Sequence, residues 1–325
     1  MDANLGEIIT SNRGFFSRGQ AIDCGESDRA LRDALRAGGI VRLRRGMYAP
    51  ADVYSGCDEA GKHLILARSV VADQTGRVSL AGTSAAALHG YAPYGHDYST
   101  VHLIRLDRGA ARREAGVNHH VVRQDIEEDL DLYDGVLAIN PARTVWEVAC
   151  RSDLEAGVVA ADSALHRDPQ LIVPIRALAD RSAQFPGSRS VRIALLLADP
   201  RAESAGESIT RVQFYRYGIP KPELQYRVMS QGGRLVGVAD FYWEEHRHLG
   251  EFDGKAKYEQ CLRPGESPAD YVFREKHREG EMRADYRGMT RFIWSEVMPR
   301  TARHTMAQLQ TRLDQSRTLY ARMAS

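Results

Sequence analysis

Residues 235–257 read LVGVADFYW-EEHR-HLGEFDGKAK, and this stretch decides the fold expected for the C-terminal part of the chain. Its two outer runs have the apolar and aromatic composition of strands and flank the polar break 244–247, which predicts a β-hairpin. A turn centred between Glu245 and His246 fixes the pairing register of the two strands. The register matters because it decides which charged side chains face one another across the hairpin.

In this register three carboxylates gather on one face of the hairpin. Asp240 lies directly opposite Glu251, with Cβ atoms about 4.5–5.5 Å apart. Asp253 shares the face of Glu251 because side chains alternate along a strand. Like charges placed opposite one another are destabilising, and a cation would relieve that cost. Three oxygen-bearing side chains suit Mg²⁺ or Mn²⁺, so the hairpin predicts the carboxylates of a metal-dependent phosphodiesterase.

Lysine is rare in this chain, and two lysines lie beside these carboxylates. Of 44 Lys and Arg residues five are Lys, namely Lys62, Lys221, Lys255, Lys257 and Lys276. A Lys ammonium is a compact charge that can act beside a scissile phosphate, which makes Lys255 and Lys257 candidates for that role. The alternative is an exposed charged hairpin whose lysines are solvated and have no chemical role.

Length and composition indicate a multidomain globular protein. The 325 residues suit two or three domains, and 43% of them are hydrophobic and 27% charged. We expect no membrane partner, because no apolar run reaches the roughly 18–20 residues that span a bilayer. Residues 1–7 do not resemble a signal peptide, and the four isolated cysteines fit a reducing cytosol, so we expect a cytoplasmic protein. The net charge of +1 means that nucleic-acid affinity must come from local patches.

The first 52 residues predict a small helical unit that ends in a basic hairpin. A short amphipathic stretch at 4–11 precedes a helix that Ser27 or Asp28 caps and that Gly38-Gly39 ends. Residues 40–48 then alternate apolar and basic residues about a turn at Arg45-Gly46. This order describes a winged helix whose arginines could contact DNA phosphates. The candidates for DNA binding are Arg18, Arg29, Arg32, Arg36, Arg42, Arg44 and Arg45. The alternative is an Arg-faced helical hairpin with a solvated surface.

Two further domains are expected, which makes the fold class α+β multidomain. A mixed α/β domain spans 55–187, and the break at Pro186-Gly187-Ser188 precedes a third domain at 188–325. Expected in the middle domain are helices at 58–72, 83–90, 142–151, 152–166 (with Ser152 as a possible N-cap) and 171–185, and strands at 100–106, 119–123 and 135–139. Expected in the third domain are helices at 190–198, 204–217, 269–286 and 299–325 and strands at 224–228 and 290–294, besides the hairpin.

The order helix, three strands, helix, strand resembles the PD-(D/E)XK nuclease core. The segment from about Arg201 to Val297 is similar to the very-short-patch-repair-like endonuclease branch in ESITR (207–211), GIP (218–220), VADF (238–241) and EFDG (251–254). The resemblance implies that Asp240 and Glu251 hold the metal and that Glu207 supports the metal or its water. Asp253 stands where that family has Lys. Either the lysine comes from a shifted position, at Lys255, Lys257 or Lys276, or hydrolysis is weak or lost.

The N-terminal half resembles the AbiEi type of abortive-infection antitoxin. The similar segments are FFSRGQA (15–21), RRGMY (44–48), SAAALHG (84–90) and PART (141–144), within about residues 1–160. The resemblance implies a winged helix that represses its own promoter and a second domain that neutralises a nucleotidyltransferase-type toxin.

These observations leave three alternative functions open. The first is a DNA-binding protein with a Mg²⁺- or Mn²⁺-dependent endonuclease-like domain, in phage defence or a toxin–antitoxin system. The second is an antitoxin-like transcriptional autorepressor whose nuclease fold has lost catalysis, which the departure at Asp253 favours. The third is a multidomain scaffold that uses neither site.

Overall fold

The computed structural model describes residues 3–92, 94–107, 111–121, 126–230, 232–254, 267–284 and 287–321. The chain divides into two compact units. Unit 1 comprises residues 1–160 and 170–191, and unit 2 comprises residues 161–169 and 192–325. The separate boundary predicted between residues 52 and 55 stays a prediction.

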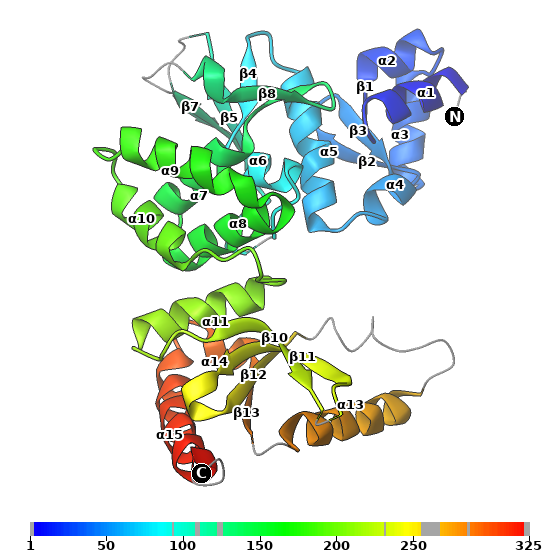
Figure 1. Ribbon diagram of the computed structural model, residues 1–325. Helices are drawn as coiled ribbons and strands as arrows, with labels where there is room; N and C mark the ends of the chain where they lie inside the picture. Colours follow the sequence, from blue (N-terminus) through cyan, green and yellow to red (C-terminus); the bar gives the residue numbers. More distant parts are fainter. Residues whose placement is uncertain are drawn as a thin grey trace. The chain divides into compact units, whose positions relative to one another are not determined.

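The first 50 residues form three helices and a small antiparallel sheet, drawn in blue in Figure 1. The elements are α1 (Ala3–Ser11), β1 (Phe16–Ser17), α2 (Arg18–Asp23), α3 (Asp28–Arg36), β2 (Ile40–Arg44) and β3 (Met47–Pro50). Ser17 and Ser27 accept backbone hydrogen bonds at the starts of α2 and α3, so these helices begin where polar caps allow. Leu5, Phe16 and Leu31 are buried between the helices and the sheet. The predicted order of helices and basic hairpin is confirmed.

The rest of unit 1 contains a six-stranded mixed sheet in the order β6-β7-β5-β4-β9-β8. Its elements are α4 (Ala51–Ser55), α5 (Glu59–Ala72), β4 (Val78–Leu80), α6 (Gly82–Leu88), β5 (Val101–Arg105), β6 (Arg112–Glu114), β7 (Val117–Val121), the 3₁₀ turn η1 (Glu127–Asp129), β8 (Leu130–Tyr133) and β9 (Val136–Ile139). The strands β5, β7 and β9 were expected from the sequence, whereas β4, β6 and β8 were not. Each missed strand has three or four residues, which is too short for a clear alternating pattern.

The segment after the sheet is helical. It contains α7 (Pro141–Arg151), α8 (Leu154–Arg167), the 3₁₀ turn η2 (Pro169–Leu171), α9 (Ile172–Arg181) and α10 (Ser188–Leu197). Asn140 caps α7 and Pro141 occupies its first turn, as is typical of helix starts. The expected cap at Ser152 is wrong, because the Asp153 carboxylate accepts the Ala156 N–H at 2.8 Å and α8 begins after it.

Unit 2 is built on a four-stranded sheet in the order β10-β11-β12-β13. Its elements are α11 (Ala205–Arg216), β10 (Glu223–Met229), β11 (Leu235–Trp243), the 3₁₀ turn η3 (Glu244–His246), β12 (His248–Asp253), α13 (Pro268–Arg283), β13 (Gly288–Ile293), α14 (Trp294–Val297) and α15 (Ala302–Ala321). The first three strands are antiparallel and β13 runs parallel to β12. The predicted order helix, three strands, helix, strand is confirmed.

Different helices cover the two faces of this sheet. On one face Phe214 of α11 packs edge-on against the rings of Phe241 and Phe292. On the other face Met282 of α13 packs with Tyr242 and Leu249. Asp240 lies two residues before Tyr242, and Glu251 lies two residues after Leu249. Because side chains alternate along a strand, Asp240 and Glu251 belong to the face that α13 covers.

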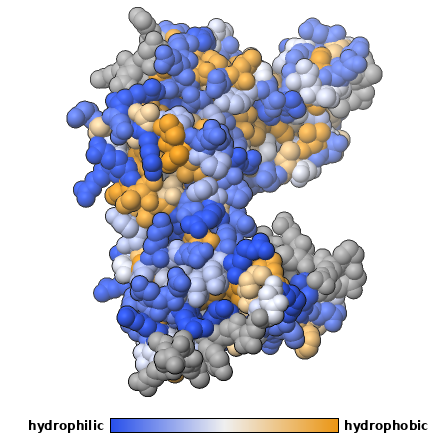
Figure 2. All heavy atoms as spheres, viewed as in Figure 1, coloured by the Kyte–Doolittle hydropathy of each residue, from blue (hydrophilic) through white to orange (hydrophobic). Residues whose placement is uncertain are grey.

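The face of the molecule drawn in Figure 2 is mostly polar. Figure 2 shows hydrophilic side chains over most of the visible face, with apolar patches over the helices. Within the described part of the chain, no helix combines the length and apolarity needed to cross a membrane.

Candidate functional site

The β11–β12 hairpin pairs in the register expected from its sequence. Phe241 lies opposite Gly250 and Trp243 opposite His248, with Arg247 in a left-handed conformation at the turn (φ 47°). Continuing this register places Asp240 across from Glu251. There the Phe252 N–H donates to Asp240 Oδ2 at 2.7 Å, so the Asp240 carboxylate bridges the two strands.

Two arginines hold the Glu251 carboxylate. Arg278 of α13 places Nη1 3.0 Å from Oε1 and Nη2 3.3 Å from Oε2, in a two-point arrangement. Arg291 of β13 places Nη2 3.3 Å from Oε2. The Glu251 side chain is 7% exposed, so both of its oxygens meet guanidinium groups in a largely water-excluded place.

Arg291 also joins neighbouring carboxylates. It is the parallel-strand partner of Glu251, and its Nη1 lies 3.0 Å from Asp253 Oδ2 and its Nη2 3.3 Å from Glu279 Oε2. Since one guanidinium reaches both Glu251 and Asp253, the prediction that these two share a face is confirmed. Arg278 similarly reaches Glu275 at 2.9 Å.

Burial raises the pKa of the Glu251 carboxyl above its ordinary value. Arg278 and Arg291 oppose this rise in the pKa, and the nearby Asp240 charge adds to it. The site thus has the electrostatics expected for crowded, buried carboxylates, and arginine charges stand where the sequence predicted a metal.

As arranged, these residues do not fit Mg²⁺ or Mn²⁺. Such ions need several oxygens free to converge at about 2.0–2.1 Å, whereas both Glu251 oxygens face guanidinium nitrogens and Asp240 Oδ2 accepts a backbone N–H. Among the residues that the structure describes, no group of three or more His, Cys, Asp or Glu side chains is placed to hold a metal ion.

The other predicted site residues lie in different surroundings. Glu207 is buried in the first turn of α11, where Ser204 Oγ donates to Oε1 at 2.7 Å and Gln225 Nε2 to Oε2 at 3.1 Å. Lys276 is exposed on α13. The predictions for Lys255 and Lys257 lie outside the described residues.

Sequence reasoning missed Arg278 and Arg291, which contact Glu251 most closely. A signal for Arg278 was present, because it lies four residues before Met282 and therefore shares the sheet-facing side of α13. Arg291 had no local signal, since its position depends on the register between β12 and β13, two strands that are separated in sequence by α13.

The second candidate site is the basic surface of the first 50 residues. Arg32, Arg42 and Arg45 are exposed, and none of them forms an ion pair in the described chain. The charge of Arg32 nevertheless adds to the contact of Arg18 in lowering the pKa of the Asp28 carboxyl. Arg29 and Arg36 flank Asp33 on the solvent side of α3, at 3.8 and 3.0 Å.

Two of the predicted DNA-binding arginines have structural partners instead. Arg18 makes a two-point contact with Asp28, at 2.7 and 2.6 Å, which joins the starts of α2 and α3. Arg44 is half-buried and reaches Asp73 at 3.4 Å. The β2–β3 pairing shifts register between Arg42 and Arg44. Such a bulge redirects side chains, so Arg42 is exposed whereas Arg44 is half-buried.

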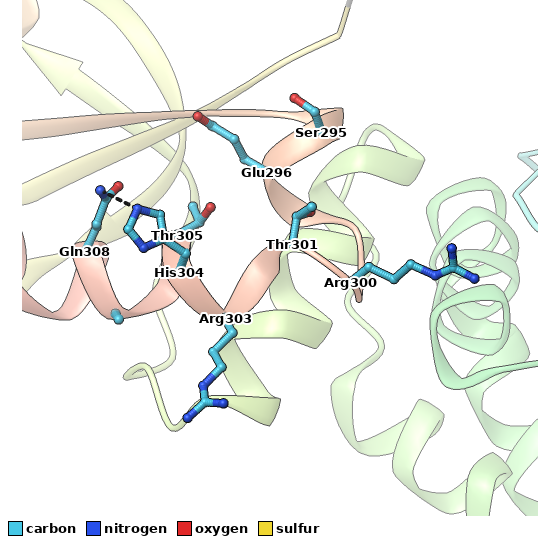
Figure 3. Close-up of a pocket in the computed structure, with 9 residues that line it drawn as sticks. Ser295, Glu296, Arg300, Thr301, Arg303, His304, Thr305 and Gln308 are labelled. Carbon is cyan, nitrogen blue, oxygen red and sulfur yellow. Dashed lines mark hydrogen bonds between the residues drawn. The ribbon is translucent and has the colours of Figure 1, made fainter.

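A groove of about 830 Å³ lies where α14 meets α15 in unit 2. Figure 3 shows Arg300 on the turn that precedes α15, Arg303 on the first turn of α15, and His304 hydrogen-bonded to Gln308, at 2.9 Å. The groove also contains Glu296, and none of the predicted site residues lines it.

Comparison with known proteins identifies a family that matches residues 7–51 and two relatives that align with about two thirds of the chain. Residues 7–51 match the protein family described as transcriptional regulator, AbiEi antitoxin. The uncharacterized proteins MT2308 and Rv2248 of Mycobacterium tuberculosis (strains CDC 1551 / Oshkosh and ATCC 25618 / H37Rv) are each 32% identical to this chain over 223 residues. The aligned residues cover 67% of this chain and 75% of each relative.

A solved structure is also similar, at greater distance. The crystal structure of the RV2827C protein from Mycobacterium tuberculosis matches with 17% identity and a TM-score of 0.39. The match covers 70% of this chain and 84% of that one. The chain belongs to the family of MT2308 and Rv2248, and its residues 7–51 form a domain of the AbiEi antitoxin type of transcriptional regulator.

Proposed function

We propose that this protein is a DNA-binding transcriptional regulator of the antitoxin type, and that its first 50 residues are a winged helix. In this proposal α3 enters the major groove and the β2–β3 hairpin is the wing. The observation that carries the proposal is a set of exposed guanidinium groups that form no ion pair in the described chain. They are Arg32, Arg42 and Arg45, on these two elements of the domain that matches a regulator family. Each can neutralise a phosphate without first breaking an ion pair.

The wing arginines provide the test. Arg42→Ala/Arg45→Ala is expected to weaken binding to the DNA upstream of the protein's own gene about tenfold or more, and to lower the slope of log Kd against log salt by roughly 1.8. Fluorescence anisotropy over a salt series measures both. The matched control is Arg77→Ala/Arg113→Ala, which removes the same charge from unit 1 outside the first domain. Equal loss in the control and the wing variant, or no loss in either, contradicts the proposal.

For unit 2 we propose a PD-(D/E)XK-like fold whose carboxylate face has lost metal-dependent catalysis. The support is the sheet order β10-β11-β12-β13 and the two guanidinium groups on Glu251. In this proposal Arg278 and Arg291 stabilise α13 on the sheet, and unit 2 serves the regulator as an interaction or DNA-clamping module. A nucleotidyltransferase-type toxin, as the antitoxin resemblance implies, is the partner we expect.

A metal-dependent endonuclease is the second candidate function. It is favoured by the position of Asp240 across from Glu251 on adjacent strands, as a nuclease of this fold would need. Asp240 and Glu251 would then bind Mg²⁺ or Mn²⁺, Glu207 would support the bound water, and Lys255 or Lys257 would act in place of Asp253. This candidate requires Arg278 and Arg291 to leave Glu251.

The two candidates predict different results in a nicking assay. With supercoiled plasmid and single-stranded DNA in Mg²⁺ or Mn²⁺, we expect no cleavage by the wild type above that of Asp240→Ala/Glu251→Ala. Divalent metal should also leave the wild-type melting temperature unchanged. Metal-dependent cleavage by the wild type that the double variant lacks would establish the endonuclease and reject the loss of catalysis.

A further inference from the structure

Unit 1 contains a cavity of about 560 Å³ beside α7, and none of the predicted DNA-binding arginines lines it. Its wall includes Arg143, Trp146, Cys150 and Arg151 of α7, with Val121 and Phe185 from the flanking segments. The volume lies within the range of roughly 300–1,000 Å³ that small-molecule sites occupy. We propose that this cavity binds a small organic anion with a flat, apolar body.

Arg143 is anchored within the cavity wall. It is 3% exposed, its Nη1 lies 3.1 Å from Asp129 Oδ2, and its Nε lies 3.2 Å from Glu147 Oε1. Asp129 is in turn held by Arg181 at 2.7 Å. These contacts fix the guanidinium plane, and its Nη2 takes part in no described hydrogen bond. A donor held in place by buried partners can bind a ligand with little loss of entropy.

A second donor comes from the neighbouring indole. Trp146 is 2% exposed, and its Nε1 is buried without a hydrogen-bond partner among the described residues. Leaving a buried donor unsatisfied is unfavourable, and an acceptor on a bound ligand would remove that penalty. Arg143 lies over the Trp146 ring, with 4.9 Å from Cζ to the centroid, so the two donors are held together.

Arg151 supplies the net charge of the cavity. Its Nη1 lies 3.0 Å from His120 Nδ1. A guanidinium can donate but not accept, so His120 Nδ1 must be the acceptor and the imidazole is neutral. Burial, with Arg151 beside it, lowers the pKa of His120 to about 4, in agreement with a neutral ring. In the described structure no carboxylate pairs with Arg151, whereas the charge of Arg143 is balanced by Asp129 and Glu147. The cavity wall therefore favours one negative charge.

The remaining wall is aromatic and shaped by a glycine. The rings of Trp146 and Phe185 meet edge to face, with centroids 5.4 Å apart at 79°. Gly187 has φ +88°, and a Cβ built on it would collide with the Cys150 carbonyl. The turn after Phe185 can therefore lie against α7 because residue 187 has no side chain. Burial also raises the pKa of the Cys150 thiol to about 11, so this wall adds no negative charge at neutral pH.

Isothermal titration of the full chain tests the site with two anions, 1-naphthoate and 1-naphthalenesulfonate, and with their uncharged counterparts, 1-naphthalenemethanol and 1-naphthalenesulfonamide. We expect at least one anion to bind and its uncharged counterpart to bind tenfold more weakly or not at all. Binding of the naphthoate alone identifies an aromatic carboxylate class, and binding of the sulfonate alone identifies an aromatic sulfonate class.

Three variants connect binding to this cavity. Arg151→Gln and Trp146→Phe should each lower the affinity for the anion by a factor of roughly 10. Arg176→Gln, which removes one exposed Arg charge on α9, should leave the affinity unchanged. Absence of binding by both anions, equal binding of the uncharged counterparts, or binding that survives Arg151→Gln and Trp146→Phe overturns the inference. Because no DNA is present, failure here does not bear on the proposed regulator function.

Discussion

Replacing Arg278 with methionine is expected to lower the free energy of unfolding of unit 2 by about 2–3 kcal/mol near neutral pH. The change keeps an unbranched side chain and removes the guanidinium, which contacts both Glu251 oxygens and, through Nη1, the Met282 sulfur at 3.1 Å. Breaking a buried ion pair costs about 3–5 kcal/mol, and the lower figure here reflects the 29% exposure of Arg278 and the contact that Arg291 retains. Urea unfolding of the full chain, followed by tryptophan fluorescence in a Trp146→Phe background, measures this loss of stability. Trp243 and Trp294 are then the remaining tryptophans, and both belong to unit 2.

Arg283→Met is the matched control for this prediction. Arg283 lies on the same helix and pairs with Glu279 at 3.4 Å on the surface, so its loss should cost about 0.3–0.5 kcal/mol. Equal effects of the two replacements would mean that the Glu251 contacts contribute little. Arg278→Met/Glu251→Gln should recover part of the loss, because the carboxylate is then no longer buried with a partner missing.

The pH dependence of the Arg278→Met variant follows from the same contacts. Burial already raises the pKa of Glu251, and loss of Arg278 should raise that pKa further. With its pKa above the unfolded value, folded Glu251 holds more protons than unfolded Glu251, so its contribution to stability falls as pH rises. The destabilisation by Arg278→Met should therefore be smaller near pH 4.5 than near pH 7.5, and a constant difference would contradict the assignment of the effect to Glu251.

The sequence predicts the elements of this protein well where its signals are local. Polar caps at Ser27, Asp58, Asn140 and Ser204 mark helix starts that the structure reproduces. Edge strands such as β6 and β8 have no comparable signal, because pairing with a neighbour rather than local pattern makes residues 112–114 and 130–133 extended.

The candidate site could be predicted only where its geometry depends on local sequence signals. The hairpin register follows from the turn around Glu245, so the placement of Asp240 opposite Glu251 could be deduced. The groups that neutralise those carboxylates could not be deduced. Arg291 lies beside Glu251 because β13 pairs in parallel with β12, and α13 separates these two strands in the sequence. A cluster of carboxylates indicates that positive charge must be present nearby, but the pattern alone does not distinguish a metal ion from guanidinium groups.

Gly206→Ala is expected to destabilise unit 2 by about 3 kcal/mol or more, or to prevent its folding. Gly206 lies in the first turn of α11, directly before Glu207, and a Cβ built there would collide with the ring of Phe252 on β12. Phe252 is 2% exposed and packs edge-on against Trp294, with centroids 5.2 Å apart, so the ring has little room to move. The close approach fixes the start of α11 against the strand that carries Glu251 and Asp253.

A double-mutant cycle separates this collision from a loss of helix propensity. In a helix without the collision, Gly→Ala should stabilise by up to about 1 kcal/mol, and Gly280→Ala on α13, where a Cβ meets nothing within 4 Å, is the matched control. Phe252→Leu alone should destabilise by opening space, and Gly206→Ala added to it should cost much less than in the wild type, a coupling of about 1–3 kcal/mol. If Gly206→Ala is tolerated in the wild-type background, or if the two changes are additive, close contact with Phe252 does not fix the position of α11.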